Sequence, residues 1–174
     1  MTGITREKAS QAAASFLGGQ SRYIGTYYET YVATDASGRE WKFTYDGSIV
    51  PEKKENGQKV TADAAYKTEL VSPICTYEDI PNIQELVRQL RHKGAFSNTS
   101  CGIHIHVEAA PFNARTLRNL VNLFYSKEDL LFSALKVNPV RWAYCRPTDE
   151  RFLQELNRKR PQTCLLYTSD AADE

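Results

Sequence analysis

The stretch "RYIGTYYETYVATDASGREWKFTYDGS" (residues 22–48) decides the fold class of this chain. It is rich in Tyr, Thr and Val, which are typical of β-strands, and the segment "DASG" (35–38) interrupts it with residues typical of turns. In its second half Trp41, Phe43 and Tyr45 alternate with polar residues, so a strand would place these aromatic rings on one face. We therefore predict a β-hairpin with an apolar face and a polar face.

Other parts of the chain have apolar residues at helical spacing. An alanine-rich run over 5–17 ends at two glycines, and a second periodic run over 78–95 ends at Gly94. The remaining expectations are helices over 113–125, 126–136 and 148–159, strands over 65–74 and 100–109, and a solvated loop over 51–64. This mixture predicts an α+β fold, a largely antiparallel sheet with helices packed on one face.

Length and charge narrow the class of protein. The 174 residues are enough for one ordinary globular domain, and 22 basic against 21 acidic residues give a net charge of +1. This balance gives no electrostatic reason to expect nucleic acid as a partner. Because no run is long enough to span a membrane and no secretory signal is recognisable, we expect a cytoplasmic protein that does not bind membranes. The four cysteines lack metal-binding spacing, and we interpret them as reduced thiols.

The last eleven residues, "CLLYTSDAADE" (164–174), resemble the translation of a sequencing adapter. We interpret this tail as an artefact, expect it to be disordered, and exclude it from the predicted domain. Without its three acids, residues 1–163 carry a net charge of +4.

The segment "SCGIHIHVEA" (100–109) contains two of the three histidines. On a strand, His104, His106 and Glu108 would share one face, with the two imidazoles about 7 Å apart. Both could then reach one metal site or one bound phosphate, or they could simply lie on an exposed strand face. A zinc hydrolase built on this pair would need further histidines, and only His92 remains.

Glu69 is the second candidate for chemistry, because it interrupts an otherwise apolar strand. A carboxylate there is costly to bury unless it is paired or bound to a metal, although an edge strand could leave it in solvent. A site that adds one imidazole to carboxylates suits Mg²⁺ or Mn²⁺ bound with a nucleotide.

Four segments carry a resemblance to a known family: "WKFTYDGSI", "TELVSPI", "CGIHIHVEAAPFNARTLRNLVNLFYSKEDLL" and "RWAYCR". In order and spacing they resemble the amidoligase family, which belongs to the carboxylate-amine ligases with a glutamine-synthetase-like catalytic fold. The resemblance covers roughly residues 2–163. It implies an ATP-dependent, ADP-forming ligase that joins a carboxylate and an amine through an acyl phosphate, with a small molecule, a peptide or a protein as substrate.

The resemblance also implies a role for each matching residue. Glu69 and His104 become catalytic ligands of Mg²⁺ or Mn²⁺, His106 and Arg146 contact the ATP phosphates, and Asp46 and Ser48 lie near the substrate. From the residues alone, Arg146 could equally lie on a solvated face or pair with a nearby acid.

One departure from the family pattern affects the expected activity. Members of the family usually begin with a strand that carries Glu-x-Glu, and this sequence contains no Glu-x-Glu. We therefore expect residues 1–163 to be a partial catalytic domain without its first strand, inactive by itself even where the full-length protein is a ligase. The alternatives are a metal-dependent hydrolase that uses the His-x-His segment and a non-catalytic binding domain.

Overall fold

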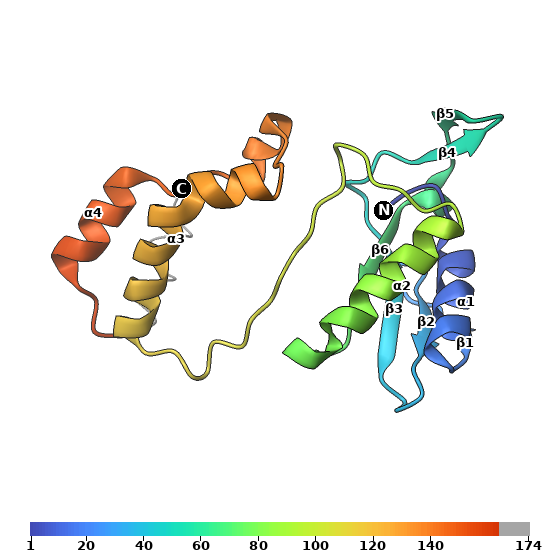
Figure 1. Cartoon of the computed structure of the whole chain (residues 1–174), viewed down its shortest axis with the longest axis horizontal. Coiled ribbons are helices and arrows are strands. Elements are labelled where there is room, and N and C mark those ends of the chain that lie inside the picture. Colours follow the sequence, from blue (N-terminus) through green and yellow to red (C-terminus); the bar gives the residue numbers. More distant parts are fainter. Residues whose placement is uncertain (164–174) are drawn as a thin grey trace. The chain divides into compact units, whose positions relative to one another are not determined.

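The computed structural model describes residues 1–163 and divides the chain into two compact units, Met1–Gly102 and a second that begins at Ile103 (Figure 1). The first unit contains α1 (Arg6–Leu17), β1 (Ser21–Tyr23), β2 (Tyr31–Thr34), β3 (Glu40–Tyr45), β4 (Glu52–Glu55), β5 (Gln58–Thr61), η1 (Ala64–Tyr66), β6 (Thr68–Val71), η2 (Tyr77–Asp79) and α2 (Ile80–His92). The second contains α3 (Ala114–Ala134), η3 (Pro139–Ala143) and α4 (Glu150–Lys159). All named strand pairs are antiparallel, so the predicted α+β class is confirmed.

The predicted hairpin forms the centre of a four-stranded sheet with the order β1-β2-β3-β6. Its arms are β2 and β3, which meet at the expected turn. The first arm is shorter than predicted, because the chain reverses again near Thr26 and makes β1 a separate strand. At this reversal the Glu29 amide donates to the Thr26 carbonyl at 2.9 Å, and Glu29 has a left-handed φ of 46°.

The core lies on one face of this sheet. Strand alternation places Trp41 and Phe43 of β3 on that face, and both are fully buried. Leu86 and Leu90 of α2 belong to the same apolar cluster, together with Ala9, Ala13 and Ala14 of α1. Both helices of the first unit therefore cover one face, as predicted, and neither covers the opposite face.

We expect Leu86→Ala to destabilise the first unit by about 3 kcal/mol, because it removes a fully buried side chain and leaves a cavity. Val87→Ala on the same helix is the matched control, since Val87 is 44% exposed and should cost less than about 0.5 kcal/mol. Urea unfolding followed by circular dichroism measures both changes. Equal effects of the two substitutions would contradict this assignment of the core.

An ionic network joins the β2–β3 turn to the start of α2. The Arg39 guanidinium donates to Asp35 at 2.8 Å and to both carboxylate oxygens of Asp79 at 2.9 and 3.0 Å. Burial raises the pKa of Asp35, but hydrogen bonds from Ser37, Arg39 and Trp41 outweigh it and hold that pKa well below its usual range. Hydrogen bonding from Arg39 also lowers the pKa of Asp79.

Because these pKa values are lowered in the folded protein, the free energy of unfolding depends on pH in the acidic region below the usual carboxyl pKa. The contribution of Asp35 is complete above its unfolded pKa of about 3.9 and declines as the pH falls below that value toward the folded pKa. We expect Asp35→Asn to lower the midpoint of thermal unfolding at pH 7 by about 5 °C or more. At pH 3, calorimetry should show a smaller difference in this midpoint between Asp35→Asn and the unsubstituted protein. Asp63→Asn, at an exposed helix cap, should show neither effect.

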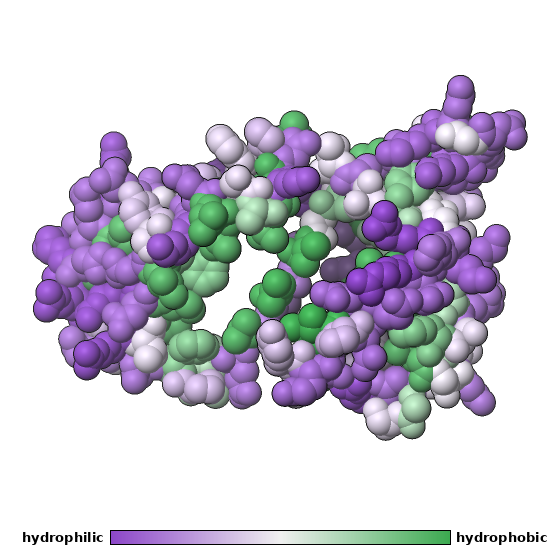
Figure 2. Space-filling view, in the orientation of Figure 1, coloured by the Kyte–Doolittle hydropathy of each residue, from purple (hydrophilic) through white to green (hydrophobic). Residues whose placement is uncertain are grey.

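The predicted solvated loop over 51–64 is wrong in part, because strands β4 and β5 form a hairpin there. Asn56 and Gly57 connect them with φ angles of 51° and 81°, the two left-handed residues of a type I′ turn. The hairpin carries mostly polar and charged side chains, so its solvated character is as expected (Figure 2).

In the second unit, α3 is a single helix where two were predicted. Its N-terminus is capped by Asn113, whose side chain accepts from the Thr116 amide at 2.9 Å. Ser126 does not cap a second helix, because its hydroxyl donates to the Leu123 carbonyl one turn back, at 2.8 Å. The final predicted helix is confirmed as α4, whose N-cap is Asp149.

Two further expectations concern the whole chain. Cys75, Cys101 and Cys145 are free thiols, as predicted, whereas Cys164 and the rest of the tail over 164–174 lie outside the described residues. Within residues 1–163, no helix combines the length and apolar character needed to cross a bilayer.

Candidate functional site

Glu69 lies in the middle of β6, as the sequence predicts. Its neighbours Thr68 and Leu70 point to the covered face, where Thr68 is fully buried and Leu70 packs against the core. Strand alternation therefore turns Glu69 to the uncovered face, where it is half-buried and lies opposite Thr44 of β3. The carboxylate is thus placed on an accessible surface by the packing of the residues beside it.

A buried arginine fixes the backbone from which β6 starts. Arg6, only 3% exposed, donates to the carbonyls of Ala64 at 2.7 Å and Lys67 at 3.1 Å. Its guanidinium also pairs with the carboxylate of Glu29 and lies over the Tyr45 ring, 5.6 Å from the centroid. These contacts satisfy the buried cation and hold the chain next to Glu69.

We expect Arg6→Met to destabilise the first unit by about 2–3 kcal/mol, because two backbone carbonyls lose a charged donor that is itself buried. Arg22→Met is the matched control, since the Arg22 side chain is 55% exposed and its ion pair with Glu40 should contribute less than about 1 kcal/mol. Chemical unfolding of both variants provides the comparison. A larger loss for Arg22→Met would refute the anchoring role of Arg6.

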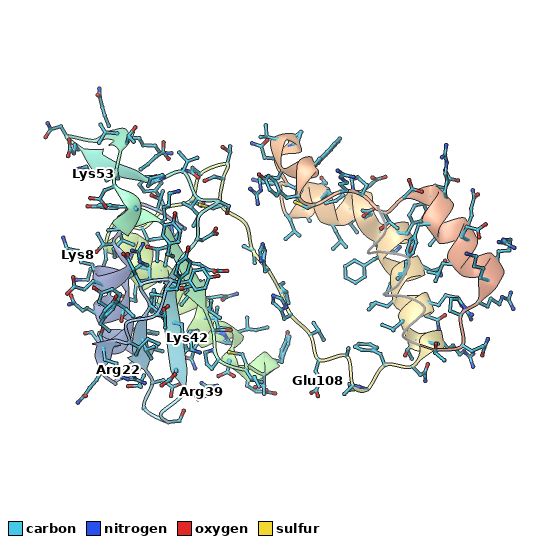
Figure 3. The ribbon with its side chains drawn as sticks, turned by 180° about the vertical axis from the view of Figure 1, so that it is seen from behind. Lys8, Arg22, Arg39, Lys42, Lys53 and Glu108 are labelled. Carbon is cyan, nitrogen blue, oxygen red and sulfur yellow. The ribbon has the colours of Figure 1, made fainter. Side chains whose placement is uncertain are left out.

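The uncovered face holds polar groups beside Glu69. A chain of hydroxyls runs along it, with Thr26 donating to Thr30 at 2.7 Å and Thr30 lying 3.1 Å from Thr44. Lys42 lies two residues before Thr44 on the same face and is exposed (Figure 3). The alternating sequence pattern predicts that Lys42 and Thr44 lie on the polar face of the hairpin. It does not predict that they lie beside Glu69.

Asp46 and Ser48 form a turn immediately after β3, close to the start of β6. The Asp46 carboxylate accepts from the Ser48 amide at 2.9 Å and from its hydroxyl at 2.7 Å. The Lys67 ammonium donates to the Gly47 carbonyl at 3.0 Å, which ties this turn to the residue before β6. The structure therefore brings the turn to the same end of the sheet as Glu69.

The strand predicted over 100–109 is wrong, because residues 101–109 have no regular secondary structure. Among the described residues none pairs with them, and Ile103 and Ile105 are 90% and 83% exposed. A β-strand depends on a neighbouring backbone for its hydrogen bonds, which a favourable residue pattern cannot replace. His104 and His106 are exposed in this segment, in the second unit.

The remaining predicted residues also lie in the second unit. Arg146 is exposed between η3 and α4, and Glu108 is exposed in the segment that precedes α3 (Figure 3). Glu69, Asp46 and Ser48 belong to the first unit, so the predicted site residues come from both.

The donor set suits a hard divalent cation, although it is small. Glu69 offers carboxylate oxygens and no side-chain hydrogen bond occupies them within residues 1–163, while His104 offers an imidazole nitrogen. Oxygen ligands with one imidazole are compatible with Mg²⁺ or Mn²⁺. In the described part of the chain, no three His, Cys, Asp or Glu side chains gather closely enough to hold a metal by themselves.

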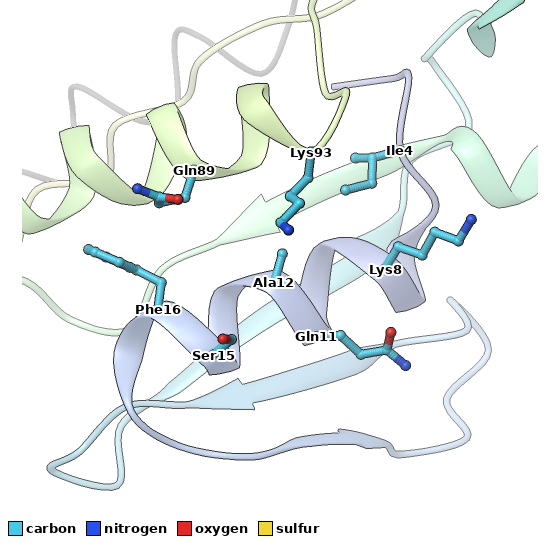
Figure 4. A pocket seen from close by; sticks show the side chains of 8 residues that line it. All are labelled: Ile4, Lys8, Gln11, Ala12, Ser15, Phe16, Gln89 and Lys93. Atoms are coloured by element: carbon cyan, nitrogen blue, oxygen red, sulfur yellow. The ribbon is translucent and has the colours of Figure 1, made fainter.

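A groove of about 600 Å³ lies elsewhere, between α1 and α2 (Figure 4). Lys8 and Lys93 line it together with apolar side chains such as Phe16. None of the predicted site residues contributes to it. The candidate site in the first unit is therefore the sheet face around Glu69, and the roles of His104 and His106 in the second unit stay predictions.

The chain matches the family described as "Putative amidoligase enzyme" over residues 1–172. It belongs to the amidoligase family. No curated protein and no solved structure matches it significantly. Membership confirms the resemblance seen in the sequence and indicates a ligase that acts on small-molecule or peptide substrates. In this amidoligase, the family match includes both units as well as the residues that carry the predicted site.

Proposed function

We propose that the full-length protein is an ATP-dependent carboxylate-amine ligase, forming an amide or peptide bond through an acyl phosphate and releasing ADP. The observation that carries this proposal is the family match over both units. The position of Glu69 supports it, because this half-buried carboxylate has no side-chain partner among residues 1–163 and lies on the sheet face that α1 and α2 leave uncovered.

The proposed reaction has two steps. A carboxylate oxygen of the first substrate attacks the γ-phosphorus of ATP, and the bond to the ADP oxygen breaks. The amine nitrogen of the second substrate then attacks the carbonyl carbon of the acyl phosphate, and inorganic phosphate leaves as the nitrogen loses a proton. Activation is needed because a free carboxylate is a poor electrophile.

Each predicted residue has a role in this scheme. Glu69 and His104 would hold Mg²⁺ or Mn²⁺, which when bound neutralises negative charge on the phosphates. His106 and Arg146 would contact phosphate oxygens, and Asp46 and Ser48 would contact the substrate. The alternative metal hydrolase rests on the His-x-His segment alone, whereas the family match favours the ligase.

We expect Mg-ATP to protect the protein against thermal unfolding, by about 2.7 kcal/mol at a hundredfold its Kd, with Zn²⁺ alone giving no protection. Glu69→Gln and His104→Ala should abolish the protection, because each removes a ligand of the cation. His92→Ala and Glu7→Gln are the matched controls, since both side chains are exposed on α1 and α2, the helices that cover the sheet face opposite to Glu69. Differential scanning fluorimetry measures all four variants.

Protection that survives both site substitutions would refute the site assignment, and protection by Zn²⁺ alone would favour the hydrolase.

We also expect the 174-residue chain to bind Mg-ATP without releasing ADP at a substantial rate. Glu69 and His104 alone would supply only two protein ligands to Mg²⁺, and they would therefore hold the cation weakly. Rapid ADP release with mixed carboxylates and amines would contradict this expectation.

A further inference from the structure

Lys42 is placed beside Glu69 by the register of the sheet. In the β3–β6 pair, Lys42 lies opposite Val71 and Thr44 lies opposite Glu69. Lys42 and Glu69 are therefore diagonal neighbours on the uncovered face. Diagonal positions of an antiparallel pair are about 7–8 Å apart, a distance that long side chains span. A ligand bound at the Glu69 carboxylate would lie within reach of the Lys42 ammonium.

Within residues 1–163, no acidic side chain pairs with Lys42. Arg22, another basic side chain on this face, pairs with Glu40, and the Lys67 ammonium before β6 donates to the Gly47 carbonyl. Lys42 makes no ion pair in the part of the chain that the structure describes, with Glu69 or with any other acid. Among the described residues, the Lys42 ammonium therefore lies next to the Glu69 carboxylate without an acidic partner of its own.

The apolar part of Lys42 also has a defined place. Val32 lies opposite Arg22 on one side and opposite Lys42 on the other, and it is fully buried although neither helix of the first unit covers this face. From this register we infer that the methylene stems of the two basic residues help to cover Val32, while their charged ends reach solvent.

We propose that Lys42 binds a phosphate oxygen of the nucleotide whose cation is held at Glu69. This inference rests on the proposed function and adds a nucleotide-binding residue to it. A triphosphate that approaches this face meets the negative charge of Glu69, and the Lys42 ammonium offsets that repulsion with three N–H donors. Lysine suits the position because it binds phosphate as a mobile point charge.

The test measures binding of pyrophosphate to the 174-residue chain by isothermal titration calorimetry, with and without MgCl₂. We expect Lys42→Gln to weaken binding about tenfold or more, the loss of one charged hydrogen bond, and Lys42→Arg to retain most of it. Lys8→Gln is the matched control, because Lys8 is an exposed lysine on α1, which covers the other face. Far-ultraviolet circular dichroism confirms that each variant is folded. A titration with acetate distinguishes phosphate recognition from general attraction of carboxylates.

The outcomes separate this inference from the proposed function. If binding depends on Mg²⁺ and on Glu69 but is unchanged in Lys42→Gln, the role of Lys42 is overturned and the metal site stands. If Lys42→Gln weakens binding whereas Glu69→Gln leaves it and its Mg²⁺ dependence unchanged, Lys42 stands and the metal role of Glu69 fails. Equal losses in Lys42→Gln and Lys8→Gln, acetate binding as tight as pyrophosphate binding, or no pyrophosphate binding at all would each overturn the role of Lys42.

Discussion

Strand alternation in β3 is the constraint on which the first unit depends. Every second side chain of this strand enters the core, and the side chains between them reach the opposite surface. Trp41 and Phe43 therefore pack in one core with residues of α1 and α2, while Lys42 and Thr44 lie outside this core. Because α1 and α2 both pack on one face of the sheet, polar side chains occupy the opposite face. Alternate residues of β3 thus contribute either to the core or to the candidate site.

Local patterns predicted much of the fold. The glycines after α1 and α2, the "DASG" turn and the apolar spacing of α2 act within a few residues, so they can be read directly from the sequence. The Asn56–Gly57 turn carries an equally local signal, but the surrounding lysines and glutamates suggested a loop. The strand expected over 100–109 failed for another reason, because pairing depends on a backbone far away in sequence that no local pattern reveals.

The candidate site was predictable to a similar extent. Glu69 stood out because a carboxylate in an apolar strand requires an explanation, and its strand is present as expected. Lys42 did not stand out, because a lysine on the polar face of a hairpin is ordinary. Only the register with β6 shows that Lys42 and Glu69 are diagonal neighbours. The roles of His104, His106 and Arg146 came from the family resemblance and remain predictions, since their spacing alone fits several kinds of site.

The link from Arg39 to Asp35 and Asp79 has a dynamic consequence. One guanidinium holds the turn of the hairpin and the first residues of the α2 region, which are separated by 40 positions in the sequence. Neither segment can open without disrupting the charged contacts of the other. The amides at the β2–β3 turn and those at the start of α2 therefore form one cooperative opening unit, and hydrogen exchange would sense them together although each lies at an end of its element.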